Sequence, residues 1–351
     1  MDKPFLANLR KIDPYVPGEQ PQSADFIKLN ANENPYPPAP GVRQVLRTFD
    51  TDSLALYPDS TGRRLQNALA ERFGIKPTQV FLGNGSDDVL ALSFQSFFCS
   101  DKPILYPDIT YSFYPVWCEL FRIPHEAVPL DEDFCVNIRG YDRPNGGVVL
   151  PNPNAPTGRG VSIDVLEDLL QHNADCVVII DEAYVDFGAQ SALPLLDQYE
   201  NLLIVQTMSK SRSLAGLRIG YALGSETLIN TLEAVKNAYN SYTLDTLAIA
   251  VGEAAVRDEA YFRETCRRIV ATRERTADAL RELGFVVHPS LTNFLFVMHT
   301  KKDASVIFDF LRQKNIYIRY FKLPRIDNYL RVTIGTDEQM DRMIAVLKEF
   351  L

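Results

Sequence analysis

Short runs of apolar residues alternate with helical segments along much of this chain, and this alternation restricts its fold more than any other feature. Three such runs are GVVLP (147–151), CVVIID (176–181) and LLIV (202–205). Strands that are apolar at every position are buried on both faces, as in a mostly parallel sheet covered by helices. The sequence therefore predicts an α/β fold in which a mostly parallel central sheet is flanked by helices.

The length of the chain, 351 residues, predicts about two domains. Residues 1–40 are irregular and rich in proline, which disfavours helix, so they are expected to form an N-terminal arm and part of a small domain. The alternating pattern fills residues 41–245, the expected large domain. Residues 246–351 contain a long charged helical stretch, short strands and two amphipathic helices, which indicate a smaller α+β domain.

Helix starts are indicated by residues that typically cap helices. Ser86 or Asp87 is expected to cap the helix that follows the glycine turn GNGSDD (83–88). Ser162 or Asp164 lies near the start of a later helix, and Thr336 is expected to cap the last one.

Charge and residue spacing argue against several classes of partner. Lys and Arg number 36 against 45 Asp and Glu, a net charge of −9, which makes nucleic acid or an anionic membrane surface a poor partner. No apolar run approaches the length of a membrane span, and the N-terminus lacks the apolar core of a signal peptide. The five cysteines are scattered, as is typical of a reduced, cytoplasmic protein, and the four histidines lack ligand spacing, so no catalytic metal is expected.

Polar residues follow three of the apolar runs: Asn154, Asp181 and Lys210. In parallel sheets, ligands bind beyond the carboxyl ends of the strands. Taken alone, Asp181 is better explained as a helix cap or as part of a buried ion pair, and Lys210 is better explained as a solvated surface lysine. Together they match the chemistry of pyridoxal phosphate, whose aldehyde forms a Schiff base with lysine and whose ring nitrogen needs an acid.

The phosphate of such a cofactor needs hydrogen-bond donors. The turn GNGSDD opens a helix, whose first backbone N–H groups bind anions, and Ser209 and Arg218 add a hydroxyl and a guanidinium. GNGSDD alone is equally compatible with a plain turn. The segment SKSRSLAGLRIGY (209–221) is the more specific signal.

This segment resembles the cofactor-lysine signature of the fold-type I aminotransferases of class I/II. PNAPTG (153–158) resembles the strand-end turn of that family, and DEAYVDF (181–187) resembles its aspartate–tyrosine pair. The order is the family's, and the resemblance covers essentially the whole chain. Within the family, LNANENPYPP (29–38), YPD (57–59), YPDITYSFY (106–114) and LRVTIGT (330–336) are similar to the histidinol-phosphate aminotransferases.

The resemblance implies pyridoxal 5'-phosphate as the cofactor and gives roles to residues around its ring. Lys210 would carry the cofactor, Asp181 would hold the pyridinium nitrogen, and Tyr111 would stack on the ring face. Tyr184 and Asn154 would hydrogen-bond the phenolic oxygen of the ring.

The resemblance also implies how the phosphate is bound. Ser86, Asp87, Ser209 and Arg218 would contact it, and Tyr57 would reach the phosphate of a neighbouring subunit, so that a homodimer is required for activity. Outside these motifs, the tyrosines would read as packing aromatics.

Substrate contacts follow from the same resemblance. Arg331, with Arg319, would bind the anionic end of the substrate, and Tyr15 and Asn32 lie on the arm that would close over it. Because Arg331 alternates with Leu330 and Val332, it is expected to face away from them. Ala155 stands where many relatives carry Asn. The arm is richer in proline than usual, so it is expected to follow a different path.

The expected reaction is transamination between L-histidinol phosphate and 2-oxoglutarate, a step of histidine biosynthesis. An aromatic aminotransferase and a phosphothreonine decarboxylase share much of the scaffold and are the alternatives within the enzyme class. A non-enzymatic regulator would ordinarily need a DNA-binding module, which this acidic chain lacks. A dinucleotide oxidoreductase would need a strand–GxGxxG–helix unit opening the sheet.

Overall fold

A seven-stranded sheet is the centre of this computed structural model, which describes residues 3–15, 18–21 and 25–351. The strand order is β2-β8-β7-β6-β5-β3-β4, and β8 runs antiparallel to both of its neighbours, whereas the pairs from β7 to β4 are parallel. The strands, in sheet order, are β2 (Val80–Asn84), β8 (Ile219–Gly224), β7 (Leu202–Thr207), β6 (Val178–Asp181), β5 (Gly147–Pro151), β3 (Ile104–Pro107) and β4 (His125–Val128).

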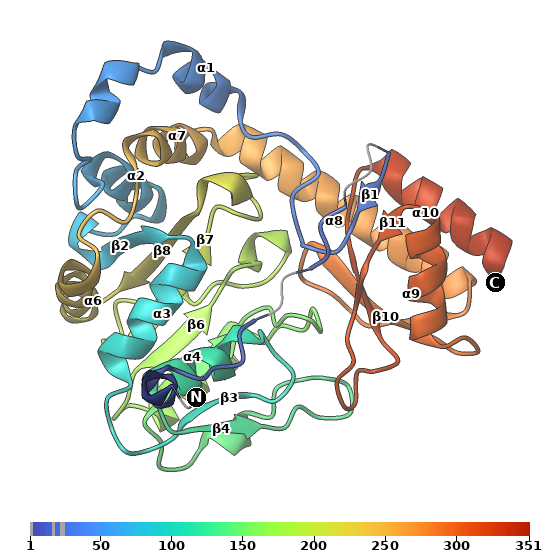
Figure 1. Cartoon of the computed structure of the whole chain (residues 1–351), viewed down its shortest axis with the longest axis horizontal. Coiled ribbons are helices and arrows are strands. Elements are labelled where there is room, and N and C mark those ends of the chain that lie inside the picture. The colour runs from blue at the N-terminus through green and yellow to red at the C-terminus, as the bar shows by residue number, and fades with distance from the viewer. Residues whose placement is uncertain (1–2, 16–17, 22–24) are drawn as a thin grey trace.

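Helices cover both faces of this sheet (Figure 1). Along β6, Val178 and Ile180 pack into one buried cluster and Ile179 packs into the other. This alternation confirms the prediction of a mostly parallel sheet buried on both faces. One face is covered by α2 (Arg63–Phe73), α5 (Ile163–His172) and α7 (Thr246–Arg257), and the other by α3 (Ser86–Phe97), α4 (Phe113–Phe121) and α6 (Glu226–Tyr239).

A smaller part with its own core follows in the chain. It contains an antiparallel sheet of order β12-β13-β10-β9, and a separate parallel pair joins β1 near the start of the chain to β11. The strands are β1 (Ile27–Lys28), β9 (Phe285–Val287), β10 (Phe294–His299), β11 (Ile316–Tyr317), β12 (Arg319–Tyr320) and β13 (Leu330–Thr333). The helices are α8 (Glu259–Glu282), α9 (Ala304–Gln313) and α10 (Asp337–Phe350).

The long charged helical stretch is two helices that meet at Asp258. The Asp258 carboxylate accepts the backbone N–H of Tyr261 and so starts α8 at the point where α7 ends. Helix α7 packs on α2 within the larger part, and α8 leads into the smaller part (Figure 1). This packing favours a domain boundary near Asp258 over one at residue 245.

The remaining helical segments are short and lie in loops, apart from α1. They are η1 (Pro4–Asn8), α1 (Pro40–Thr48), η2 (Thr51–Ala55), η3 (Pro77–Gln79), η4 (Ile138–Tyr141), η5 (Val185–Phe187), η6 (Leu193–Leu195) and η7 (Ala215–Leu217).

Two predictions about helix caps have different outcomes. Thr336 caps α10 in a capping box with Gln339, as predicted. The prediction for α3 is wrong, because Gly85 is the N-cap and Ser86 and Asp87 already lie in the first helical turn. Gly85 has a φ of 84°, a left-handed conformation that suits glycine, and the turn ends one residue earlier than its polar residues suggest.

Candidate active site

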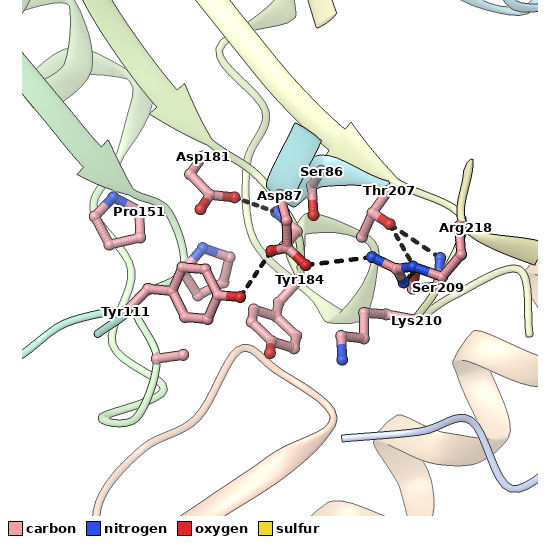
Figure 2. Close-up of a pocket in the computed structure, with 13 residues that line it drawn as sticks. Ser86, Asp87, Tyr111, Pro151, Asp181, Tyr184, Thr207, Ser209, Lys210 and Arg218 are labelled. Atoms are coloured by element: carbon pink, nitrogen blue, oxygen red, sulfur yellow. Dashed lines mark hydrogen bonds and ion pairs between the residues drawn. The ribbon is translucent and has the colours of Figure 1, made fainter. Parts of the chain in front are cut away.

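The carboxyl ends of β5, β6 and β7 meet at one cavity, as the parallel topology predicts (Figure 2). Asp181 is the last residue of β6, Thr207 is the last of β7, and Lys210 follows Thr207 in the next turn. The lining residues are Ser86, Asp87, Tyr111, Pro151, Pro153, Ala155, Asp181, Ala183, Tyr184, Thr207, Ser209, Lys210 and Arg218.

Asp181 is a buried carboxylate held by neutral groups. Its side chain accepts the hydroxyl of Tyr114 at 2.7 Å and the backbone N–H of Ala183 at 3.1 Å, and the residue is 5% exposed. Burial raises the pKa of Asp181 to about 6, although these two hydrogen bonds oppose the shift. A protonated ring nitrogen placed against Asp181 would supply the positive partner that a buried carboxylate needs.

Lys210 projects toward the same cavity from the turn after β7 (Figure 2). Its ammonium donates to the carbonyl oxygen of Ala31 at 3.2 Å and lies 5.7 Å from the centre of the Tyr184 ring. The backbone of this turn is fixed, because Asn34 donates to the carbonyl oxygens of Lys210 and Ser211 at 3.0 and 3.3 Å. The amine is therefore carried by a rigid turn and lies beside Tyr184.

One end of the cavity is built to bind an anion. The N-terminus of α3 points at it, and the guanidinium of Arg218 lies across it, 3.4 Å from the Ser209 hydroxyl. Glycine at position 85 permits this approach, because an added Cβ would lie 2.3 Å from Arg218 Nη2. Ser86, Ser209 and Arg218, which the sequence predicts as phosphate ligands, therefore lie together.

The side chain of Asp87 does not fit its predicted role. Its carboxylate pairs with Arg218 at 3.2 Å and accepts the hydroxyl of Tyr111 at 2.7 Å. A carboxylate repels a phosphate, so Asp87 can contribute only its backbone N–H in the first turn of α3. Its carboxylate instead orients Arg218 and Tyr111.

Asn154 is committed to the turn that it begins. Its amide donates to the Ile109 carbonyl at 2.8 Å and to Thr157 Oγ1 at 3.0 Å, and its oxygen accepts the Thr110 hydroxyl at 3.0 Å. The residue is buried and is not among those that line the cavity, although its neighbour Ala155 is. A hydrogen bond from Asn154 to a cofactor ring stays a prediction, and it requires one of these contacts to be exchanged.

A second cavity adjoins the first and shares Tyr111, Ala155, Tyr184 and Lys210 with it. Arg331 lies in its wall, and its guanidinium carbon is 5.3 and 5.7 Å from the ring centres of Phe294 and Phe321.

The guanidinium of Arg331 is not fully paired. Arg331 Nη2 donates to the Asn30 carbonyl at 3.0 Å, but Arg331 Nε is buried and has no hydrogen-bond partner among residues 3–15, 18–21 and 25–351. Burial lowers the pKa of Arg331 from its ordinary value, an effect that a bound anion would oppose. Leu330 and Val332 point into the small core, which confirms the predicted alternation.

The other predicted substrate residues have mixed placements. Tyr15 lines the second cavity with its ring stacked on Phe113 at 4.4 Å, and Arg319 lies opposite Arg331 on the neighbouring strand β12. Asn32 lines it too, but its side chain is bonded to Tyr184 and Thr333 rather than left free for a substrate.

Tyr57 lies outside both cavities. It is 83% exposed, and its ring stacks on Tyr242 at 4.7 Å. Within a single chain, Tyr57 therefore does not contact the site.

Two residues at the site, Thr207 and Tyr114, were not predicted from the sequence. Thr207, which accepts the backbone N–H of Ser209 at 3.1 Å, could have been found as the polar residue that ends an apolar strand. Tyr114 could not, because it lies on α4, 67 residues before its partner Asp181.

The donor set as a whole fits pyridoxal phosphate. An amine, a buried carboxylate and an anion-binding helix terminus lie around one cavity, at positions suited to the aldehyde, the ring nitrogen and the phosphate. Within residues 3–15, 18–21 and 25–351, no three His, Cys, Asp or Glu side chains gather as metal ligands, and no helix is long and apolar enough to span a membrane.

Comparison with known sequences gives the same class of protein. Residues 24–347 match the family described as aminotransferase class I and II. The chain is 51% identical over 344 residues to a histidinol-phosphate aminotransferase of Acinetobacter baumannii, covering 97% of this chain and 95% of the relative. It is 52% identical over 349 residues to that of Chromohalobacter salexigens, covering 99% of each. The chain therefore belongs to the class I and II aminotransferases, and the predicted resemblance to the histidinol-phosphate aminotransferases is confirmed.

Solved structures confirm the predicted fold. A histidinol-phosphate aminotransferase from Sinorhizobium meliloti in complex with pyridoxal-5'-phosphate superposes with a TM-score of 0.83 at 25% identity, covering 93% of this chain and 92% of that chain. An L-threonine-O-3-phosphate decarboxylase from Porphyromonas gingivalis gives a TM-score of 0.80 at 22% identity, covering 93% and 99%. The second likeness shows a shared fold only.

Proposed function

We propose that the protein catalyses transamination between L-histidinol phosphate and 2-oxoglutarate, giving imidazole-acetol phosphate and L-glutamate, a step of L-histidine biosynthesis. The observation that carries this proposal is the Arg331 guanidinium in the cavity that shares Lys210 with the cofactor site. Its buried Nε has no hydrogen-bond partner in the part of the chain that the structure describes. Full-length relatives at about 50% identity that are named histidinol-phosphate aminotransferases support it.

The chemistry requires pyridoxal 5'-phosphate, which, when bound, supplies an aldehyde that bonds to amines and a ring that withdraws electrons from the substrate. Lys210 lines the cavity where its amine would hold the aldehyde, and the same amine would act as the base that moves the proton at the substrate α-carbon. Asp181 would keep a proton on the ring nitrogen, and Ser209 and Arg218 would hold the phosphate at the N-terminus of α3.

One guanidinium serves both substrates. L-Histidinol phosphate carries a phosphate monoester, and glutamate carries a carboxylate in its place. The planar guanidinium of Arg331, which lies beside the rings of Phe294 and Phe321, can pair with either anion. Specificity for an anionic substrate therefore follows from the positive charge of Arg331 in the wall of this cavity.

A substrate comparison tests the proposal. Purified enzyme with pyridoxal phosphate and 2-oxoglutarate is offered L-histidinol phosphate, L-phenylalanine or O-phospho-L-threonine, and the release of glutamate and carbon dioxide is followed. Glutamate should form far faster from histidinol phosphate. A preference for phenylalanine, or carbon dioxide from phosphothreonine, would replace the proposal with the aromatic aminotransferase or the decarboxylase.

We also propose that the enzyme is a cytoplasmic homodimer in which Tyr57 contacts the partner's cofactor phosphate. The exposure of Tyr57 supports this, because its neighbours Leu56 and Tyr242 are exposed as well, and exposed apolar side chains that lie together mark an interaction surface. Five free cysteines fit a reducing compartment.

Mixed dimers test whether Tyr57 of one subunit contributes to the active site of the other. Tyr57→Ala and Lys210→Ala proteins, each impaired alone, are unfolded together and refolded as a mixture. If Tyr57 serves the partner's site, the mixed dimer contains one complete site and activity returns. Each variant refolded by itself is the control, and no gain in the mixture would show that Tyr57 does not act across the subunits.

A further inference from the structure

Three asparagines of one short segment, Asn30 to Asn34, each contact a different residue of the site. The carbonyl of Asn30 accepts Arg331 Nη2, Asn32 donates to the hydroxyl oxygen of Tyr184, and Asn34 donates to the carbonyl of Lys210, at 3.0, 2.8 and 3.0 Å. The segment therefore connects the anion-binding arginine, the tyrosine and the lysine. Of the three contacts, that of Asn32 reaches the functional end of a side chain that faces the cofactor cavity.

The side chain of Asn32 is fixed in orientation. Its oxygen accepts the hydroxyl of Thr333 at 2.9 Å, which leaves its NH₂ group facing Tyr184. The backbone is fixed as well, because its N–H donates to Thr333 Oγ1 at 3.0 Å and its carbonyl accepts Asn293 Nδ2 at 2.9 Å. Asn32 has a φ of 55° and is 1% exposed. Left-handed backbone is tolerated by Asn and Asp, which explains the residue type at this position.

This orientation decides where the proton of Tyr184 points. A phenol has one proton to donate, and an oxygen that accepts a hydrogen bond from Asn32 must direct that proton elsewhere. Tyr184 lines both cavities, and its ring is held edge-on to Phe294 at 5.2 Å. The hydroxyl therefore donates into the cavity, where the ring of the cofactor would lie.

We infer that Asn32 is a positioning residue that keeps the Tyr184 hydroxyl as a hydrogen-bond donor to the ring oxygen of bound pyridoxal phosphate. The inference rests on the proposed function, since it needs the cofactor in the cavity. A donor at this oxygen stabilises negative charge on it and favours the deprotonated form of the bound cofactor. Asn32 would thus set the pH at which the cofactor changes protonation state, without touching the cofactor or the substrate.

A pH titration of the absorbance of the cofactor-loaded enzyme, without substrate, tests the inference. In Asn32→Asp the carboxylate accepts a hydrogen bond from the Tyr184 hydroxyl, which then no longer donates to the cofactor. The pKa of the bound cofactor should therefore rise by about one unit. In Asn32→Ala the hydroxyl is free to turn either way, and a smaller rise is expected. Asn293→Ala is the matched control, because it removes a hydrogen bond to the Asn32 backbone but leaves the Asn32–Tyr184 contact, and it should lower the melting temperature without moving the titration.

A double variant separates an effect through Tyr184 from a general disturbance. In a Tyr184→Phe background, Asn32→Ala and Asn32→Asp should cause no further shift. Equal shifts in Asn32→Ala, Asn32→Asp and Asn293→Ala, or additive shifts on Tyr184→Phe, would overturn the inference. A wild-type protein that binds no pyridoxal phosphate would overturn the proposed function instead, so the two failures are distinguishable.

Discussion

Replacement of Arg331 by alanine removes a guanidinium from the wall of the second cavity. Among the residues that the structure describes, this group donates one hydrogen bond, to the carbonyl of Asn30, and it lies beside the rings of Phe294 and Phe321. Its remaining donors are the groups that we expect an anionic substrate to bind, and they include Nε, for which the described residues offer no hydrogen-bond partner. The substitution should therefore weaken the binding of the substrate far more than that of the cofactor, since Arg331 does not line the cofactor cavity.

The size of the effect follows from leaving a substrate anion without its partner. Losing one side of a buried, hydrogen-bonded charge pair costs about 2–5 kcal/mol, so kcat/KM should fall about 30-fold to several thousand-fold. The fall should appear with histidinol phosphate and with glutamate alike. Rates for both substrates, and the affinity for pyridoxal phosphate from absorbance, are the measurements.

The control is Arg342→Ala, which removes an exposed arginine of the same part of the chain that pairs with Asp25. It should leave kcat/KM near the wild-type value, because exposed ion pairs contribute little. Thermal unfolding of both variants checks that Arg331→Ala remains folded. A folded Arg331→Ala enzyme with kcat/KM within threefold of wild type would refute the reasoning about the anion.

Three further predictions concern the cofactor cavity. Lys210→Ala should fold and bind pyridoxal phosphate only non-covalently, so borohydride should fix no cofactor to it and turnover should be negligible; a covalent adduct at another lysine would contradict this. Burial raises the pKa of Asp181 to about 6, so its protonated carboxyl stabilises the cofactor-free protein at low pH. That contribution, roughly 3 kcal/mol, is lost as the pH rises through 6. Asp181→Asn should therefore weaken the fall in melting temperature between pH 4 and 7, and an unchanged profile would contradict the raised pKa of Asp181. Gly85→Ala should weaken cofactor binding at least about tenfold, because the left-handed φ and the 2.3 Å approach to Arg218 leave no room for a methyl group, and unchanged affinity in equilibrium dialysis would show that the turn adapts.

The strands that carry the site were predictable because their signal is local. Each buried strand is a continuous apolar run, and the polar residue that follows it must lie at the carboxyl edge of a parallel sheet. Asp181 and Lys210 could therefore be placed at one crevice from the sequence alone. The alternation of Arg331 with Leu330 and Val332 was predictable for the same reason, since side chains on a strand alternate between faces.

The contacts that tune the site were not predictable, because they join residues far apart in the chain. Asn32 and Tyr184 are 152 positions apart, and no local sequence pattern around either residue predicts the hydrogen bond between them. The contact of the Asp87 carboxylate was not predictable for another reason. An acidic residue is favoured in the first turn of any helix, so its presence could not reveal that the carboxylate pairs with Arg218.

The junction between the two parts of the chain was also hidden. The helical pattern runs on through residue 258, since Asp258 both follows the last residue of α7 and caps α8. A change of direction between two capped helices leaves the periodicity on each side intact, so a sequence pattern cannot distinguish it from one long helix.

A single-turnover experiment tests the central claim most directly. Enzyme loaded with pyridoxal phosphate is mixed with L-histidinol phosphate in the absence of 2-oxoglutarate, and the bound cofactor and the released product are followed together. One imidazole-acetol phosphate should form per Lys210, with the amino group retained on the cofactor and no carbon dioxide released. A cofactor spectrum that does not change, under conditions in which L-phenylalanine changes it, would contradict the account of the substrate.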